Sequence, residues 1–141
     1  MRIRDILASK GSAVVVMPPT ASVRDLVVTL EQHNLGAVVV AADGHRVDGI
    51  VTERDVVRQL VLGPQILDWP LSEIMTTEVR TCGPDDTVQS LAATMTSARI
   101  RHLPVVEDGE LSGIVSIGDV VKSHISDLEF ERDQLEGYLS G

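Results

Sequence analysis

The chain has 141 residues, a formal net charge of −9, one cysteine and only 2% aromatic residues. This composition argues against nucleic-acid binding, because an acidic surface repels phosphates and few aromatic rings are available for stacking. It also excludes an internal disulfide, and with no signal-peptide pattern and no apolar run of roughly 20 residues, we expect a cytoplasmic protein with an aliphatic core.

The first half of the chain predicts a strand, a helix, a hairpin and a second helix. Val23, Leu26, Val27 and Leu30 recur at the spacing of one helical face, directly after the candidate N-cap Ser22. In chain order, the remaining expected elements are a strand at 13–16, strands at 37–40 and 47–51 joined by an Asp-Gly turn, and a helix at 53–62.

A segment at 63–76 separates this half from the next and contains the turn pairs Gly63-Pro64 and Trp69-Pro70. Within it, residues 71–75 resemble residues 3–7 in their pattern of apolar and polar positions. We expect each of these two short stretches to form a lead-in helix that packs on the neighbouring half of the chain.

The second half repeats the first. The expected elements are a strand at 79–81, a helix opened by Thr87, strands at 103–106 and 111–115, and a helix at 118–126. Gly113-Ile114-Val115 follows Gly49-Ile50-Val51 at a distance of 64 positions, and both segments continue with a hydroxyl residue and an aspartate. Upstream of the Asp-Gly turns the distance is 65, so one hairpin loop is a residue shorter, as expected after a duplication.

Beyond the second repeat the sequence predicts one long amphipathic helix that continues the last repeat helix. The apolar positions that define its stripe are Val121, Ile125, Leu128, Leu135 and Leu139. A stripe so far from the core is expected to cover a neighbouring subunit, and the alternative is a helix folded back on its own chain.

The duplicated pattern resembles a tandem pair of cystathionine-β-synthase (CBS) domains, also called a Bateman module. The resemblance rests on residues 49–55, 101–105 and 113–119 and covers nearly all of residues 1–124. It implies an α/β (α+β) fold of two repeats, 1–66 and 67–124, each a small mixed sheet with two helices, related by a pseudo-twofold axis. Residues 125–141 form the C-terminal helical extension, and the resemblance also implies disc-shaped homodimers.

Two strand-to-helix corners are the candidate binding positions. Thr52 with Asp55, and Ser116 with Asp119, have the spacing of a capping box, in which the hydroxyl and the carboxylate satisfy free backbone N–H groups. Capping is one interpretation of these residues. The other is a ligand site, because a helix N-terminus favours phosphate, and the resemblance assigns the two aspartates to the ribose of an adenosine ligand.

The remaining candidate residues surround these corners. Adenine is expected among aliphatic side chains and strand backbone, and phosphates are expected near cationic side chains. The candidates are Val16, Met17, Ile50, Val51, Pro104, Ile114 and Val115 for adenine, and Arg54, Arg101 and His102 for phosphate. The repeats differ at these cationic positions, so the two clefts are expected to be inequivalent, and the sequence does not decide which one binds.

The leading functional hypothesis is a regulatory sensor that binds AMP, ADP, ATP or NAD(H) and signals to an unidentified effector protein in trans. The alternative is a ligand-free module for dimerisation or protein interaction. No nucleophile is paired with a base and no His/Cys cluster has the spacing of metal ligands. We therefore expect neither an enzyme nor a metal site nor a required cofactor.

Overall fold

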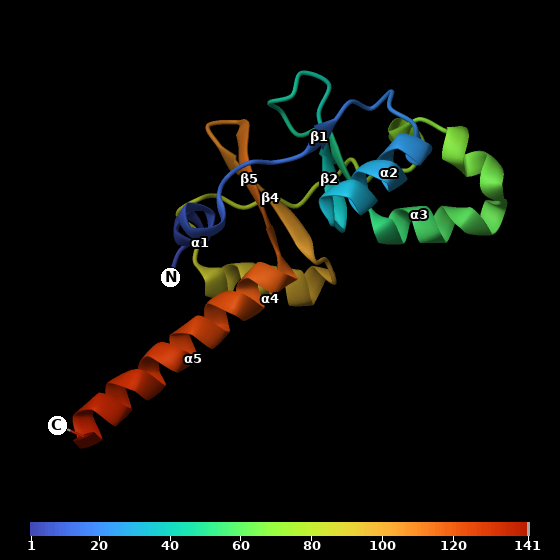
Figure 1. Cartoon of the computed structure of the whole chain (residues 1–141). Coiled ribbons are helices and arrows are strands. Elements are labelled where there is room, and N and C mark those ends of the chain that lie inside the picture. Colours follow the sequence, from blue (N-terminus) through green and yellow to red (C-terminus); the bar gives the residue numbers. More distant parts are fainter. Residues whose placement is uncertain (141) are drawn as a thin grey trace.

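The computed structural model describes residues 1–140 and contains two small β-sheets, each covered by helices (Figure 1). The first sheet has the order β1-β2-β3, with β1 parallel to β2 and β2 antiparallel to β3. The second sheet pairs β4 with β5 in antiparallel orientation. The strands are β1 (Val16–Met17), β2 (Ala37–Val40), β3 (Gly49–Thr52), β4 (His102–Glu107) and β5 (Glu110–Ser116).

Five α-helices and three 3₁₀ turns complete this part of the chain. The α-helices are α1 (Ile3–Lys10), α2 (Val23–His33), α3 (Glu53–Gln59), α4 (Val88–Ala98) and α5 (Ile117–Ser140). The 3₁₀ turns are η1 (Leu60–Leu62), η2 (Pro64–Asp68) and η3 (Leu71–Glu73). Ser22 and Thr87 cap α2 and α4 as predicted, because each hydroxyl accepts a hydrogen bond from a backbone N–H three residues later.

Several predicted boundaries are wrong. The first strand lies at Val16–Met17 instead of 13–16, and no strand forms at 79–81. In its place Cys82 makes a single parallel bridge to Val105, so the second repeat presents a two-stranded sheet. The helix expected at 53–62 ends at Gln59 and continues as the tighter turn η1, and the lead-in at 71–75 is the 3₁₀ turn η3.

The lead-in segments exchange between the two halves, as the sequence predicted. Ile3 and Ile6 of α1 are buried in the core of the second repeat, while Leu71 and Ile74 are buried in the core of the first. The crossing bonds are symmetric: the N–H of Val88 donates to the carbonyl of Met1 at 3.1 Å, and the N–H of Val23 donates to the carbonyl of Trp69 at 2.9 Å.

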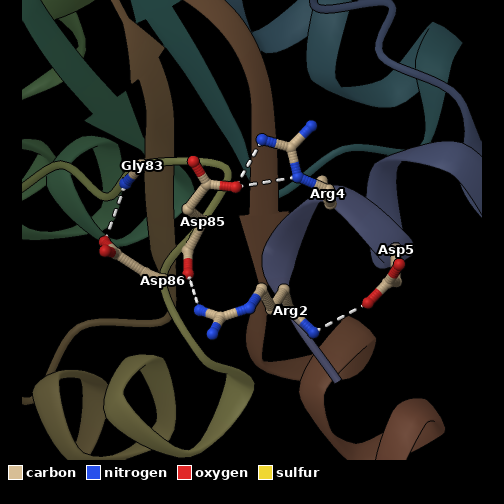
Figure 2. A network of polar contacts seen from close by, with 6 residues as sticks. All are labelled: Arg2, Arg4, Asp5, Gly83, Asp85 and Asp86. Atoms are coloured by element: carbon tan, nitrogen blue, oxygen red, sulfur yellow. Dashed lines mark hydrogen bonds and ion pairs between the residues drawn. The ribbon is translucent and has the colours of Figure 1, made fainter.

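Polar contacts hold α1 against the second repeat (Figure 2). The Arg4 side chain donates to the Asp85 carboxylate, and the Arg2 side chain donates to the Asp85 carbonyl. Asp86 in turn accepts from the N–H of Gly83 at 2.8 Å, which shapes the loop ahead of α4. These contacts fix the start of α1 beside the second repeat, so the far end of the helix reaches the second strand-to-helix corner.

The glycine that opens each Gly-Ile-Val motif makes room for a crossing segment. A Cβ at Gly49 would lie 2.7 Å from the Met75 sulfur and 3.0 Å from the Thr76 carbonyl oxygen. A Cβ at Gly113 would lie 2.7 Å from a methyl carbon of Leu7. Both glycines therefore allow the exchanged segments to approach the sheets closely.

Candidate functional site

The two predicted strand-to-helix corners both form capping boxes. The N–H of Thr52 donates to Asp55 Oδ2 at 2.8 Å, and the N–H of Asp55 donates back to Thr52 Oγ1 at 3.3 Å. In the second repeat the N–H of Ser116 donates to Asp119 Oδ2 at 2.8 Å, with a return bond of 3.3 Å. The capping role is thus present in both corners.

A cleft of about 500 Å³ opens at the first corner, between the two repeats. This volume lies within the range of small-molecule sites, about 300–1,000 Å³. From the first repeat the cleft is lined by Ile50, Thr52, Arg54 and Asp55 among the predicted residues, and from the second by Arg101 and His102. The fold therefore brings six predicted site residues from both repeats to one opening.

The other predicted residues lie elsewhere. Ser116 and Asp119 form the second corner, and the adenine candidates Val16, Pro104 and Ile114 do not line the cleft at Asp55. Val51 and Met17 belong to the buried core of the first repeat, and Val115 belongs to that of the second. Of the aliphatic candidates, Ile50 alone lines the open cleft.

Cationic residues that the sequence analysis did not single out also line the cleft. They are Arg58, Arg80 and Arg99. Arg58 lies one helical turn after Arg54 on α3, so the helical spacing already places these two side by side, whereas Arg80 and Arg99 come from separate segments that only the folded chain brings to the cleft. The acidic residues Glu53, Asp55 and Glu78 share the lining, and Asp55 Oδ1 accepts no hydrogen bond within residues 1–140.

The second corner is engaged by the chain itself. Lys10, the last residue of α1, donates to Asp119 Oδ2 at 2.7 Å, and the two side chains are 34% and 18% exposed. Although burial of Asp119 opposes its ionisation, the hydrogen bonds from Lys10 and Ser116 lower the pKa of this carboxyl. A ligand at Asp119 must therefore compete with the Lys10 ammonium.

His102 lies between the two corners. A Cβ added at Gly36 would come within 3.2 Å of the imidazole, so the small residue lets the ring approach the start of β2. Burial lowers the pKa of His102, although the nearby carboxylates of Glu53 and Asp119 oppose that effect. The ring is therefore neutral at neutral pH in the free protein.

Three further features of residues 1–140 concern the single cysteine, metal-ligating side chains and the hydrophobicity of the helices. Burial raises the pKa of the Cys82 thiol to about 12, which keeps it protonated and unreactive. No group of three or more His, Cys, Asp or Glu side chains in this part of the chain could hold a metal ion. Within the same residues, every helix is too short or too polar to cross a bilayer.

Comparison with known proteins gives consistent similarities over nearly the whole chain. The family model "CBS domain" matches residues 3–62 and again 71–125. The chain is 35% identical to the mitochondrial CBS domain-containing protein CBSX3 of Arabidopsis thaliana, over 99% of this chain and 72% of the relative.

Solved structures show the same architecture. The CBS-domain containing protein ATU1752 of Agrobacterium tumefaciens is 44% identical, with a TM-score of 0.84 over 87% of this chain and 92% of that one. The CBS domain pair of MJ0100, solved in complex with 5′-methylthioadenosine and S-adenosyl-L-methionine, is 25% identical, with a TM-score of 0.80 over 90% of this chain and 98% of that one.

Proposed function

Because the chain belongs to the CBS-domain family and contains two copies of the domain, we propose that it is a regulatory module that binds an adenosine-containing ligand between its repeats. The observation that carries this proposal is the cleft of about 500 Å³ at Asp55, where Thr52 and Asp55 of one repeat face Arg101 and His102 of the other. A ligand there contacts both repeats, so binding is coupled to their relative position.

The Asp55 carboxylate is suited to a ribose. Its Oδ2 atom accepts the hydrogen bonds of the capping box, which orient the carboxylate, and Oδ1 remains available for a ribose hydroxyl. In this arrangement Ile50 supplies apolar contact to the base, and the arginines face the phosphates. Thr52 keeps its capping bond, so the same two residues would cap α3 and bind the ligand.

The candidate ligands are AMP, ADP, ATP and NAD(H). The bound methylthioadenosine and S-adenosylmethionine of the MJ0100 pair support adenosine recognition by this fold and extend the panel to be tested. The ligand acts as a signal only if it binds one arrangement of the repeats more tightly than another. An effector protein then reads that arrangement in trans, and the module carries out no catalytic step.

A thermal-shift assay with nucleotide-stripped protein and the whole panel tests the proposal. A ligand present at 100 times its dissociation constant raises the free energy of unfolding by roughly 2.7 kcal/mol. For a domain of this size that gain corresponds to a shift of at least about 5 °C. If no adenosine compound shifts the melting temperature, the sensor proposal is wrong.

A second candidate function, a module for self-association, is favoured by one specific observation. Helix α5 extends well beyond the second repeat (Figure 1), and its predicted apolar stripe is exposed, with Val121 at 51% and Leu139 at 82% exposure. The distal end of α5 projects away from both repeats and does not fold back onto them (Figure 1). We propose that this stripe lies at the interface of a homodimer, which is compatible with ligand binding at Asp55.

Truncation after Ser126 tests the role of this helix. Removing the distal stripe is expected to weaken self-association, measured by sedimentation equilibrium, because the dimer loses buried apolar area. The matched variant Lys122→Gln changes the polar face of the same helix and is expected to leave association unchanged. An oligomer of unaltered strength after truncation contradicts the assignment.

A further inference from the structure

Two exposed apolar surfaces lie on helices at equivalent positions of the two repeats. The first, which we call the α3–η1 patch, consists of side chains that are between 44% and 88% exposed: Val57, Leu60, Val61 and Leu62. The second is the α5 stripe, whose Val121 and Ile125 lie 64 positions after Val57 and Val61. Apolar side chains gathered on one exposed helical face are typical of a surface that another protein covers.

The distal half of the α5 stripe is flanked by acidic side chains on both sides. Leu128 and Leu135 lie on nearly the same line along the helix, because seven residues make almost two full turns. Glu129 and Glu136 lie on one side of this line, and Glu131 lies on the other. A second α5 laid against this stripe, in either orientation, would bring carboxylates together and cause like-charge repulsion.

The α3–η1 patch has cations at its edge instead. Between Asp55 and Asp68 the only charged residue of the sequence is Arg58, which is exposed and follows Val57 of the patch directly. Arg54 lies one helical turn before Arg58 on α3. Neither guanidinium forms an ion pair within residues 1–140. An acidic partner can therefore pair with these two arginines without displacing an existing contact.

The α5 stripe and the α3–η1 patch of one chain do not meet. Helix α5 runs without interruption from Ile117 to Ser140, and its distal end leads away from α3 (Figure 1). A helix of 24 residues is about 36 Å long, and only Val120 and Ser123 at its start are buried against the repeats. A second copy of the chain offers the same patch, and a twofold axis would repeat the contact in both directions.

From these observations we infer that the distal α5 stripe docks on the α3–η1 patch of a second copy of this chain, with its acidic flanks beside Arg54 and Arg58. The inference rests on the self-association proposed above and adds which two surfaces meet. Each dimer contains two such contacts, so Leu128 and Leu135 of each copy are covered by the other. Because both arginines also line the Asp55 cleft, each docked helix lies beside the cleft of the other copy.

Cysteine crosslinking of the full chain tests which surfaces meet. One variant carries Val61→Cys and a second carries Leu135→Cys, and both positions are exposed, so both variants are expected to fold. When the two variants are mixed and treated with a short bis-maleimide, we expect a crosslinked dimer, whereas each variant alone should give little. The parent chain is the control for Cys82, whose thiol stays protonated.

Charge reversal measures the contribution of the flanks. Arg58→Glu should weaken self-association about tenfold in sedimentation equilibrium, because an attraction becomes a repulsion at both contacts of the dimer. Reversing the acidic flanks in the same chain, with Glu129→Lys, Glu131→Lys and Glu136→Lys, should restore most of the association. Arg46→Glu changes the net charge equally at an exposed loop position and serves as the matched control.

The outcomes separate this inference from self-association itself. If Leu135→Cys alone crosslinks as efficiently as the mixture, α5 pairs with α5, and the inference is overturned while self-association stands. The same holds if the chain dimerises but the mixture does not crosslink, or if Arg58→Glu and Arg46→Glu weaken association equally. If the parent chain is monomeric, both the inference and self-association fail. A crosslink specific to the mixture, together with rescue by the three lysines, supports the inference.

Discussion

The two strand-to-helix corners form the same capping box but have different surroundings. Their capping boxes agree, with amide-to-carboxylate distances of 2.8 Å in both. Around Asp55 stand five arginines without ion-pair partners in residues 1–140, whereas Asp119 is bound by Lys10. The positions that correspond to the five arginines are occupied by Gly118, Lys122, Val15, Asn34 and Gly36.

This difference shows how a duplicated fold can become functionally asymmetric. Capping stabilises each helix whether or not a ligand is present, so both corners contribute to stability. The five arginines, by contrast, are concentrated at one corner and form no ion pair within residues 1–140. The proposed function therefore assigns the ligand to the corner at Asp55, while Asp119 is held by Lys10 of α1.

The largest expected effect is the loss of ligand affinity when Asp55 is replaced by asparagine. Asp55→Asn should weaken binding of the adenosine ligand at least about tenfold, because a charged acceptor of ribose hydrogen bonds is lost. Asp119→Asn, the matched variant, should change affinity less than about twofold. Titration calorimetry measures both, and a greater loss in Asp119→Asn would reverse the assignment of the corners.

A smaller effect is expected on stability when the Lys10 contact is removed. Lys10→Met should lower the free energy of unfolding by about 1 kcal/mol, because Asp119 loses a half-buried partner. The control Arg24→Met breaks an exposed pair of 3.4 Å with Asp68 and should cost less, about 0.3 kcal/mol. Urea unfolding measures both, and equal losses would mean that Lys10 has no special role.

The same contact has a signature in pH. The pKa of Asp119 is lowered in the folded state, so its contribution to stability is present above about pH 4 and disappears as the pH falls through the lowered pKa. In Lys10→Met this acid-dependent loss should be smaller. An unchanged acid profile would contradict the contact.

The smallest effect is expected at His102, which lies between the corners. Its pKa is lowered by burial, so the unfolded chain binds the proton first and the free energy of unfolding decreases as the pH falls below about 6.5. His102→Gln should lack this decrease. NMR titration of the free protein should show a pKa below that of an exposed histidine, and a normal value would contradict the burial argument.

The sequence predicts the repeated local devices well, because each depends on neighbouring residues. Ser22 and Thr87 cap their helices, and the spacing of Thr52 with Asp55 sets the first corner. The strand at 79–81 fails because Cys82 makes its bridge to Val105 and the preceding residues stay outside the ladder. A local sequence pattern that favours an extended backbone does not reveal whether a partner strand lies in register beside it.

The cationic cleft could be predicted only in part. Arg54 and Arg101 lie next to recognisable motif residues, and Arg58 lies four positions after Arg54 on the same predicted helix, where the spacing could have identified it. Arg80 and Arg99 are single charges in two separate segments, and only the tertiary arrangement brings them to the cleft. The one local sign was the substitution of Arg99 for Asn34 between the repeats, at a helix end that requires a left-handed residue.

The exchange of lead-in segments couples the unfolding of the two repeats. Each half completes its hydrophobic core with a segment from the other half of the chain: Ile3 and Ile6 pack in the second core, and Leu71 and Ile74 pack in the first. If the chain were cut between the halves, the two fragments should stay associated, because each contains the lead-in segment that completes the core of the other. The two repeats are therefore expected to unfold in a single cooperative transition.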